Sequence, residues 1–327
     1  MERYRVFVTR AIPQEGLEIL GRFCDVEVSA IPGAIPREVL LEKVKGKHGI
    51  LALLTDTIDR EVMEAASETL RVISNYAAGF NNIDVEEATR RGIMVTNTPG
   101  VLAETTADLT FALLLAVARR IVEGDKLVRS GQFTGWDPLL LLGEDVYGKT
   151  LGIVGLGRIG KAVARRALGF SMQVLYYSRR ALPKEEEKAL RVRYVELPEL
   201  LQCADFVTLH VPLTEATHHL IGERELAMMK KSAYLVNTSR GPVVDEKALV
   251  RALREGIIRG AALDVFENEP DVEEELLTLP NVVLAPHIGS ASLATRTRMA
   301  MMAADNLVKA LRGERPEYLV NPEVLKG

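Results

Sequence analysis

The chain has 327 residues, a length that favours two domains over a single compact core. Its net charge of −4 argues against a general nucleic-acid-binding protein, because neutralising phosphates requires a basic face. Two cysteines far apart in the sequence, Cys24 and Cys203, argue against a disulfide framework and a cysteine zinc site. They favour reduced thiols in a cytoplasmic protein.

The N-terminal third alternates short apolar runs with helical patterns, and its first ten residues lack the apolar region of a signal peptide. Strands are predicted at residues 5–9, 26–29, 49–54, 71–75 and 93–96. Helices are predicted between them, at residues 16–23, 36–44, 60–66 and 85–90. This alternation is typical of a parallel sheet covered by helices.

A long helix is predicted from about Ala103 to Ser130. Its most apolar part, Leu109–Ala118, is too short to cross a bilayer, so we expect a buried helix and no membrane partner. Residues 131–148 follow without a helical or strand period, and they are too apolar for a free linker. We expect this arm, which contains Trp136, to pack against another surface such as a second subunit.

A second alternating series matches a dinucleotide-binding fold built from two mononucleotide halves. Its six predicted strands lie at residues 151–154, 173–177, 206–211, 233–237, 260–265 and 282–285. The final predicted helix, Leu293–Leu311, has no strand before it in this series. It can therefore return to the first domain and make that domain discontinuous.

A glycine-rich GxGxxG segment follows the first strand of this series and opens a helix predicted at Lys161–Gly169. The pattern alone is common and could be a plain strand–turn–helix, but this context favours a loop for the cofactor pyrophosphate at a helix N-terminus. The predicted cofactor loop consists of Gly155, Gly157, Arg158, Ile159 and Gly160.

The end of the next predicted strand carries Ser178, Arg179 and Arg180, where NAD sites usually place an acid. Guanidinium groups suit a 2′-phosphate, so this segment favours NADP(H), with NAD(H) as a weaker alternative. The competing interpretation is that both arginines belong to a solvated loop.

Charged or imidazole side chains follow three further strands, in the segments 237–241, 264–270 and 286–290. With these segments, the glycine loop, residues 76–84 and residues 96–100, the chain resembles the D-isomer-specific 2-hydroxyacid dehydrogenases. Among them it most resembles the glyoxylate/hydroxypyruvate reductases, from the first strand to the last helix.

The resemblance implies an α/β fold of two Rossmann-like domains. One is a doubly wound dinucleotide-binding domain at residues 100–287, and the other is a smaller, flavodoxin-like substrate domain formed by residues 1–99 and 288–327. It also implies an oxidoreductase that transfers a hydride from NADPH to a small 2-keto acid, and a homodimer. Trp136 of the arm is then expected at the partner's active site or in ordinary dimer packing.

Arg240, Glu269 and His287 correspond to the catalytic residues of this family. Arg240 can hold the substrate carboxylate in a fork, and His287 suits a general acid because histidine titrates near neutral pH. Glu269 can pair with His287 and fix its ring. Each alone could be structural, but their positions on successive strand ends favour one site.

The resemblance also implies neighbours of the cofactor and the substrate. Asp264 is expected either to contact the nicotinamide or to support the catalytic residues, and the backbone of Ala78 and Gly79 to cradle a carboxylate. Further predicted cofactor contacts are Thr106, Val211, Pro212, Thr238, Ser239, Arg240, His287 and Gly289. Further predicted substrate contacts are Leu53, Arg240, His287 and Ser290.

No metal site is predicted, because no metal-binding pattern occurs and the neighbours His218 and His219 would point different ways on a helix. Sibling enzymes acting on D-lactate, phosphoglycerate, phosphite or formate remain alternatives. A more distant alternative is an NAD(H)-sensing binding protein like the C-terminal-binding corepressors, which carry extra terminal segments.

Overall fold

The computed structural model describes residues 3–326. The chain divides into two compact units, which we call the discontinuous unit (Met1–Leu102 with Ala291–Gly327) and the central unit (Ala103–Ser290). Both boundaries lie three residues beyond the predicted ones, so Gly289 and Ser290 belong to the central unit. Within the described residues, none of the helices has the length and hydrophobicity that a membrane crossing requires.

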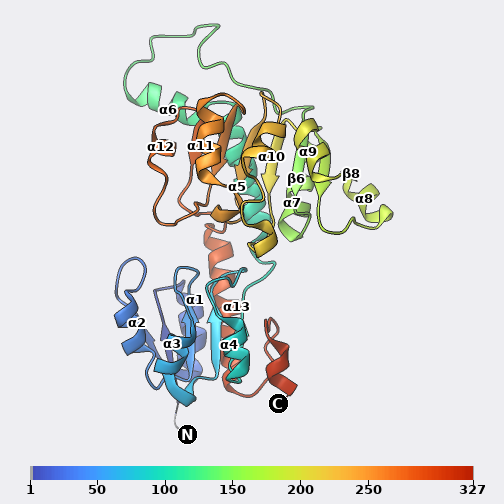
Figure 1. Ribbon diagram of the computed structural model, residues 1–327. Coiled ribbons are helices and arrows are strands. Elements are labelled where there is room, and N and C mark those ends of the chain that lie inside the picture. Colours follow the sequence, from blue (N-terminus) through green and yellow to red (C-terminus); the bar gives the residue numbers. More distant parts are fainter. Residues whose placement is uncertain (1–2, 327) are drawn as a thin grey trace. The chain divides into compact units, whose positions relative to one another are not determined.

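The discontinuous unit is formed by the N-terminal segment, blue to teal in Figure 1, and the C-terminal segment, in red. It contains a five-stranded parallel sheet in the order β2-β1-β3-β4-β5, the order of flavodoxin-like folds. β3 is buried along its whole length, as expected for a parallel strand covered on both faces. The strands are β1 (Tyr4–Val8), β2 (Cys24–Val28), β3 (Gly49–Ala52), β4 (Val72–Asn75) and β5 (Met94–Thr96).

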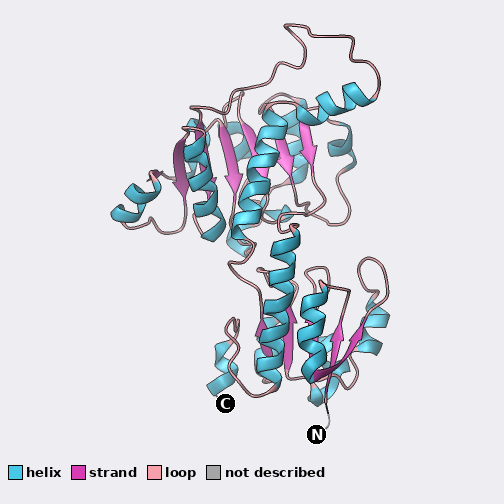
Figure 2. Ribbon diagram, turned by 180° about the vertical axis from the view of Figure 1, so that it is seen from behind, coloured by secondary structure: helices cyan, strands magenta, loops and turns pink. Residues whose placement is uncertain are grey.

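Helices cover both faces of this sheet (Figure 2). They are α1 (Gln14–Phe23), α2 (Arg37–Lys43), α3 (Arg60–Ala66), α4 (Val85–Arg90) and α13 (Leu293–Leu311). Two one-turn 3₁₀ helices complete the unit, at Ser67–Thr69 and Pro322–Lys326. Asp59, Asp84 and Ser292 cap the N-termini of α3, α4 and α13, because each side chain accepts a backbone N–H of the first turn.

The last helix, α13, packs against α1 and β4 of the discontinuous unit. The Ser74 hydroxyl donates to the Ala303 carbonyl at 2.8 Å, and the Tyr76 hydroxyl donates to the Arg296 carbonyl at 2.7 Å. The chain therefore returns to its first unit after leaving the central one.

The central unit contains a seven-stranded parallel sheet in the order β12-β11-β10-β9-β6-β7-β8. This is the doubly wound dinucleotide-binding order with one further edge strand, which confirms the predicted fold class. The strands are β6 (Thr150–Val154), β7 (Gln173–Tyr177), β8 (Val192–Tyr194), β9 (Phe206–Leu209), β10 (Tyr234–Asn237), β11 (Gly260–Leu263) and β12 (Val282–Leu284). The short strand β8 was not predicted.

Helices cover both faces of the second sheet as well. They are α5 (Ala103–Ala118), α6 (Ile121–Arg129), α7 (Arg158–Gly169), α8 (Lys184–Leu190), α9 (Leu197–Cys203), α10 (Glu223–Met228), α11 (Glu246–Arg254) and α12 (Glu274–Thr278). Short 3₁₀ helices occur at Glu215–Thr217 and Gly241–Val243.

The prediction of one helix over residues 103–130 is wrong, because the chain breaks it into α5 and α6 at Arg120. Arg120 has φ 54°, in the left-handed region that ends a helix. The carbonyl of Ala118 accepts the N–H of Glu144 at 2.9 Å. The returning arm thus supplies a hydrogen-bond donor to a carbonyl group at the C-terminus of α5. Residues 131–148, the arm, contain neither helix nor strand, as predicted.

Candidate active site

The glycine loop follows β6 at the carboxyl edge of the central sheet. Gly155 has φ +96°, and a Cβ there would lie 2.7 Å from the carbonyl oxygen of His210, so only glycine fits. A Cβ on Gly160 would collide with the carbonyl of Gly155, so glycine also allows α7 to approach β6 closely. The helix begins at Arg158, three residues earlier than predicted.

Gly157 differs from its neighbours, because a Cβ at this position would meet nothing within 4 Å. The backbone of Gly157 is therefore open to a ligand, and it lies at the N-terminus of the twelve-residue helix α7. Both features suit the pyrophosphate of a dinucleotide. The loop residues therefore fit a nicotinamide cofactor, which Gly155–Gly160 would hold by backbone N–H groups.

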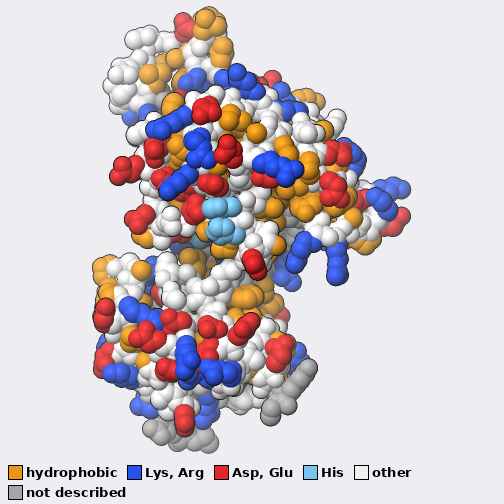
Figure 3. Space-filling model, in the orientation of Figure 1, with side chains coloured by type: hydrophobic (Ala, Val, Ile, Leu, Met, Phe, Trp, Pro, Cys, Tyr) orange, Lys and Arg blue, Asp and Glu red, His pale blue; other side chains and the backbone are white. Residues whose placement is uncertain are grey.

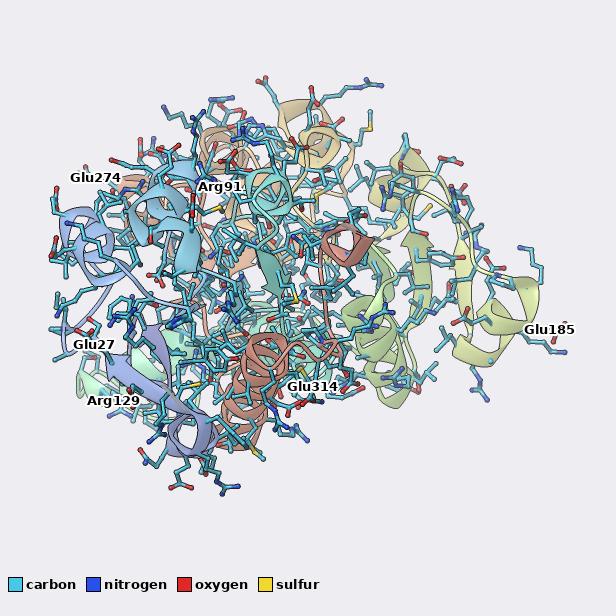
Figure 4. The ribbon with its side chains drawn as sticks, turned by 90° about the horizontal axis from the view of Figure 1, so that it is seen from below. Glu27, Arg91, Arg129, Glu185, Glu274 and Glu314 are labelled. Carbon is cyan, nitrogen blue, oxygen red and sulfur yellow. The ribbon has the colours of Figure 1, made fainter. Side chains whose placement is uncertain are left out.

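The loop after β7 lies beside the glycine loop, since Val154 and Tyr177 are paired in the sheet. The Tyr176 hydroxyl donates to Glu187 of α8 at 2.8 Å and accepts the N–H of Leu182 at 2.7 Å, which fixes the turn. Glu187 is buried, whereas Glu185 on the same helix extends into solvent (Figure 4).

The predicted 2′-phosphate residues lie in this turn. The Ser178 hydroxyl donates to the Arg180 carbonyl at 2.6 Å. Arg179 and Arg180 are exposed, and neither forms an ion pair with any residue between 3 and 326. Their guanidinium groups are thus available for an anionic ligand.

Glu269 and His287 form a hydrogen-bonded pair, with Nδ1 of His287 donating to Oε2 of Glu269 at 2.8 Å. The other carboxylate oxygen of Glu269 accepts the N–H of Phe266 at 3.1 Å. Burial alone would raise the pKa of Glu269, but the hydrogen bond and charge of His287 bring it below its ordinary value. The carboxylate is therefore charged at neutral pH, and Nε2 of His287 is left for other partners.

Arg240 follows β10 and is held by its own loop. Its carbonyl accepts the Asn237 side-chain amide at 3.0 Å, and its guanidinium donates to the Ser239 carbonyl at 2.7 Å. Burial lowers the pKa of Arg240, and the charge of Glu269 opposes this shift, so the two side chains interact electrostatically.

Gly241 brings the loop of Arg240 against the loop of Glu269. A Cβ at this position would overlap the carbonyl of Phe266 and crowd the N–H of Glu267. Glycine is therefore required for the close approach of the two loops, although the sequence pattern gives it no chemical role.

Asp264 supports the segment that carries His287. Its two carboxylate oxygens accept the N–H groups of Ile288 at 2.7 Å and Gly289 at 2.8 Å, and its carbonyl accepts the N–H of His287 at 2.9 Å. His287 itself has φ 52°, a left-handed conformation that these bonds hold. Of the two roles expected for Asp264, the hydrogen bonds favour support of the catalytic residues.

Threonine hydroxyls lie behind these loops. Thr106 donates to the Gly289 carbonyl at 3.2 Å, Thr110 donates to the Thr106 carbonyl at 2.8 Å, and the hydroxyls of Thr110 and Thr238 are 2.9 Å apart. Ser239 donates to the Asn237 side chain at 2.8 Å. The predicted cofactor neighbours Thr106 and Thr238 are thus joined through Thr110, whereas Ser239 is held separately by Asn237.

His210 was assigned only to a strand, yet it follows β9 beside the cofactor loop. The sheet register places it between Gly155 and Thr238, and Val211 and Pro212 follow it. Neither ring nitrogen of His210 has a hydrogen-bond partner among the described residues, and burial lowers its pKa to about 3. The ring is therefore neutral at every physiological pH.

The candidate substrate residues of the discontinuous unit lie at the ends of β3 and β4. The carbonyls of Ala78 and Gly79 accept the amides of Asn97 at 2.6 Å and Asn75 at 2.8 Å. Their own N–H groups donate no hydrogen bond to residues 3–326 and can receive an anion. Leu53 is half-buried, with its N–H bound by Asp56 at 2.7 Å.

The helical conformation assumed for His218 and His219 in the sequence analysis is wrong. These residues follow a 3₁₀ turn instead of lying on a helix, and their rings stack with centroids 4.1 Å apart. Glu267 completes a group of three possible metal ligands. Ser290, the remaining predicted substrate contact, is half-buried at the end of the central unit.

Comparisons with known proteins agree with this geometry. The NAD-binding-domain model of the D-isomer specific 2-hydroxyacid dehydrogenases matches residues 111–289, more than half of the chain. A glyoxylate reductase from Thermococcus litoralis is 55% identical over 325 residues, which cover 98% of both chains. The chain belongs to the D-isomer specific 2-hydroxyacid dehydrogenase family.

Two further members of the family bear on this dehydrogenase. A glyoxylate reductase from Korarchaeum cryptofilum is 57% identical over 325 residues, covering 98% of this chain and 97% of that protein. An NADPH-dependent glyoxylate/hydroxypyruvate reductase from Sinorhizobium meliloti, solved with NADP and malonate, is 33% identical with a TM-score of 0.86. That match covers 99% of this dehydrogenase and 98% of the solved chain. The family predicted from the motifs is confirmed, and with it a nicotinamide cofactor and a small acid substrate.

Proposed function

We propose that this dehydrogenase reduces glyoxylate and hydroxypyruvate to glycolate and D-glycerate, with NADPH preferred over NADH. The observation that carries the proposal is the His287–Glu269 pair, 2.8 Å apart at the sheet edge that also carries the glycine loop. The names of the relatives from Thermococcus litoralis and Sinorhizobium meliloti support these substrates.

His287 acts as the general acid. Glu269 occupies Nδ1, so Nε2 is the ring nitrogen that gives its proton to the carbonyl oxygen of the substrate. When bound, the reduced nicotinamide supplies the hydride that the carbonyl carbon accepts. The product is a 2-hydroxy acid, and His287 regains a proton from solvent before the next turnover.

Arg240 holds the substrate carboxylate. A guanidinium can pair with a carboxylate through two parallel hydrogen bonds, and burial strengthens that attraction. Positioning by this fork would place the 2-keto group next to His287. Leu53, Ala78, Gly79 and Ser290 are the further candidate substrate contacts, with the free N–H groups of Ala78 and Gly79 suited to a carboxylate.

The preference for NADPH rests on the loop after β7. Ser178, Arg179 and Arg180 offer a hydroxyl and two unpaired guanidinium groups, and no acid in this turn would repel a 2′-phosphate. The further cofactor contacts are assigned to Thr106, Gly155, Gly157, Arg158, Ile159, Gly160, Val211, Pro212, Thr238, Ser239 and Gly289. Asp264 is assigned to support of the His287 segment instead of to the cofactor.

A homodimer is part of the proposal, and the arm supports it. The arm exposes large apolar side chains along its length. They include Phe133 (51% exposed), Trp136 (85%), Leu139 (76%), Leu142 (56%) and Tyr147 (74%). Several large apolar side chains exposed within one short segment favour an interaction site, and a second copy of the chain is the proposed partner.

The direct test follows NADPH and, separately, NADH at 340 nm in the presence of glyoxylate, hydroxypyruvate, pyruvate or phosphite. The expected result is fast oxidation with glyoxylate and hydroxypyruvate, with kcat/KM higher for NADPH. Turnover with pyruvate alone would refute the substrate assignment, and equal turnover with both cofactors would refute the cofactor preference. Light scattering coupled to gel filtration tests the dimer.

A further inference from the structure

A second group of side chains with ligand chemistry lies on the central unit, outside the residues assigned to catalysis. One possible ligand atom from each of His218, His219 and Glu267 lies within 4.8 Å of the other two. Figure 3 shows an exposed histidine patch, in pale blue, with acidic side chains beside it. Two imidazoles and one carboxylate form a donor set typical of zinc and other first-row transition metals.

The backbone holds two of these ligands in place. His219 has φ 49°, and its N–H donates to the Pro242 carbonyl at 2.8 Å. Its Nε2 donates to Oε1 of Glu267 at 2.6 Å, while Oε2 of Glu267 accepts the N–H of Glu246 at 3.3 Å. The orientation of both ligands is therefore fixed by hydrogen bonds before any ion binds, as in metal sites with a supporting outer shell.

Negative charge accumulates behind the two histidines. Glu246 is buried at the start of α11, and it accepts the N–H of Glu267 at 2.7 Å. Glu246 and Glu267 each accept the backbone N–H of the other, so their two carboxylates lie close together and their like charges repel. A divalent cation bound to Glu267 would reduce this repulsion.

We propose that His218, His219 and Glu267 bind a divalent transition-metal ion of the zinc class, at a site separate from the His287–Glu269 pair. Ligand atoms around tetrahedral zinc lie about 3.3 Å apart, given metal–ligand distances of about 2.0–2.1 Å. The His219–Glu267 contact opens slightly to admit the ion, and the exposed side chain of His218 turns inward. Water takes the fourth position.

Such an ion would join two segments that are distant in the sequence. His218 and His219 precede Ile221, which bridges to Val244 beyond the Arg240 loop, and Glu267 lies two residues before Glu269. The ion would fasten the loop that carries Glu269 to the body of the unit. This role does not depend on the proposed substrate or on the cofactor preference.

The test is isothermal titration of Zn²⁺ into the full-length protein, prepared without a histidine tag and without cofactor or substrate. We expect one ion per chain with a micromolar or lower Kd, and no comparable heat with Mg²⁺. His218→Ala should weaken binding at least tenfold to a hundredfold, the loss that outer-shell changes alone often cause. Because His218 is exposed, this variant should keep the circular dichroism spectrum of the parent.

Two matched variants separate the site from general attraction of cations. Glu215→Gln removes an exposed carboxylate near His218 without removing a ligand, so it should bind Zn²⁺ like the parent. Glu267→Gln should lose binding as His218→Ala does. Saturating Zn²⁺ should also raise the Tm of the parent by a few degrees and leave that of His218→Ala unchanged.

The proposal is wrong if the parent binds no Zn²⁺, or if His218→Ala and Glu267→Gln bind it as tightly as the parent does. It is also wrong if binding disappears in His287→Ala but survives in His218→Ala, since the ion would then belong to the catalytic pair. None of these results depends on turnover, so the proposed reaction can fail or succeed independently.

Discussion

Two regions at the same edge of the central sheet differ in how their functional side chains are held. In the loops after β10, β11 and β12, Asp264 uses both carboxylate oxygens and Glu269 uses both of its own. In the loop after β7, Arg179 and Arg180 are exposed and lack ion-pair partners within the described chain.

The difference follows from the task proposed for each region. Proton transfer requires a donor fixed within a fraction of an ångström, so His287 is held from two sides by Asp264 and Glu269. Attraction of a phosphate depends mainly on charge and tolerates mobile guanidinium groups. Substitutions in the first region should therefore affect chemistry, and those in the second region should affect the choice of cofactor.

The largest effect is expected for His287→Ala. Turnover should fall by about 10²- to 10⁴-fold, the range for loss of a general acid, while NADPH binding followed by fluorescence titration stays within a few-fold of the parent. His48→Ala, in the discontinuous unit, is the control for removal of a histidine elsewhere. Turnover near that of the parent would remove His287 from the acid role.

The double variant Arg179→Ala/Arg180→Ala tests the second region. The ratio of kcat/KM for NADPH over NADH should fall by about tenfold to a thousandfold, because charge-assisted hydrogen bonds to the 2′-phosphate are lost. The value for NADH should remain close to that of the parent. Arg193→Ala on β8 removes an exposed arginine without touching this turn, and an effect as large there would contradict the assignment.

Two glycine substitutions, one in the catalytic loops and one in the cofactor loop, should differ in their effect on the free energy of unfolding. Gly241→Ala should lower the free energy of unfolding by about 2–3 kcal/mol, because its methyl group overlaps the Phe266 carbonyl. Gly157→Ala should change it by less than about 0.5 kcal/mol, since its methyl group meets nothing, yet it should weaken cofactor binding. Urea unfolding and cofactor titration measure both, and equal losses of stability would refute the argument.

A smaller effect than that of Gly241→Ala is expected from Glu246, a buried acid at the start of α11. The pKa of Glu246 is raised to about 6 from 4.5, so its burial disfavours the folded state increasingly between pH 4.5 and 6 and fully above pH 6. Glu246→Gln should therefore be more stable than the parent by about 1–2 kcal/mol at pH 7. The advantage should disappear below pH 4.5, and a constant difference across this range would exclude the titration of Glu246 as its cause.

Much of the fold could be predicted because its elements obey local rules. The helix Leu293–Leu311 has the predicted bounds, since Ser292 caps its start and its apolar face is continuous. The break at Arg120 could not be predicted, because neither glycine nor proline marks it and the bond from Glu144 closes α5. The strand β8 has only three residues and exists only through its pairing with β7.

The candidate site could also be predicted only in part from the sequence. Strand ends predicted that Arg240, Glu269 and His287 share one edge, but the Glu269–His287 bond and the supporting role of Asp264 required the three-dimensional arrangement. The stacking of His218 on His219 was missed, because a helical conformation was assumed where the chain adopts a left-handed one at His219.

The exposed arm also has a spectroscopic consequence. Trp136 is the one tryptophan of the sequence, and 85% of its surface is accessible in the single chain. Emission excited at 295 nm therefore reports on one position of the arm and on no other part of the protein. A red emission maximum that shifts to shorter wavelength as the protein concentration rises would show that the indole ring leaves water. The concentration at the midpoint of that shift would then report the dissociation constant of self-association through the arm.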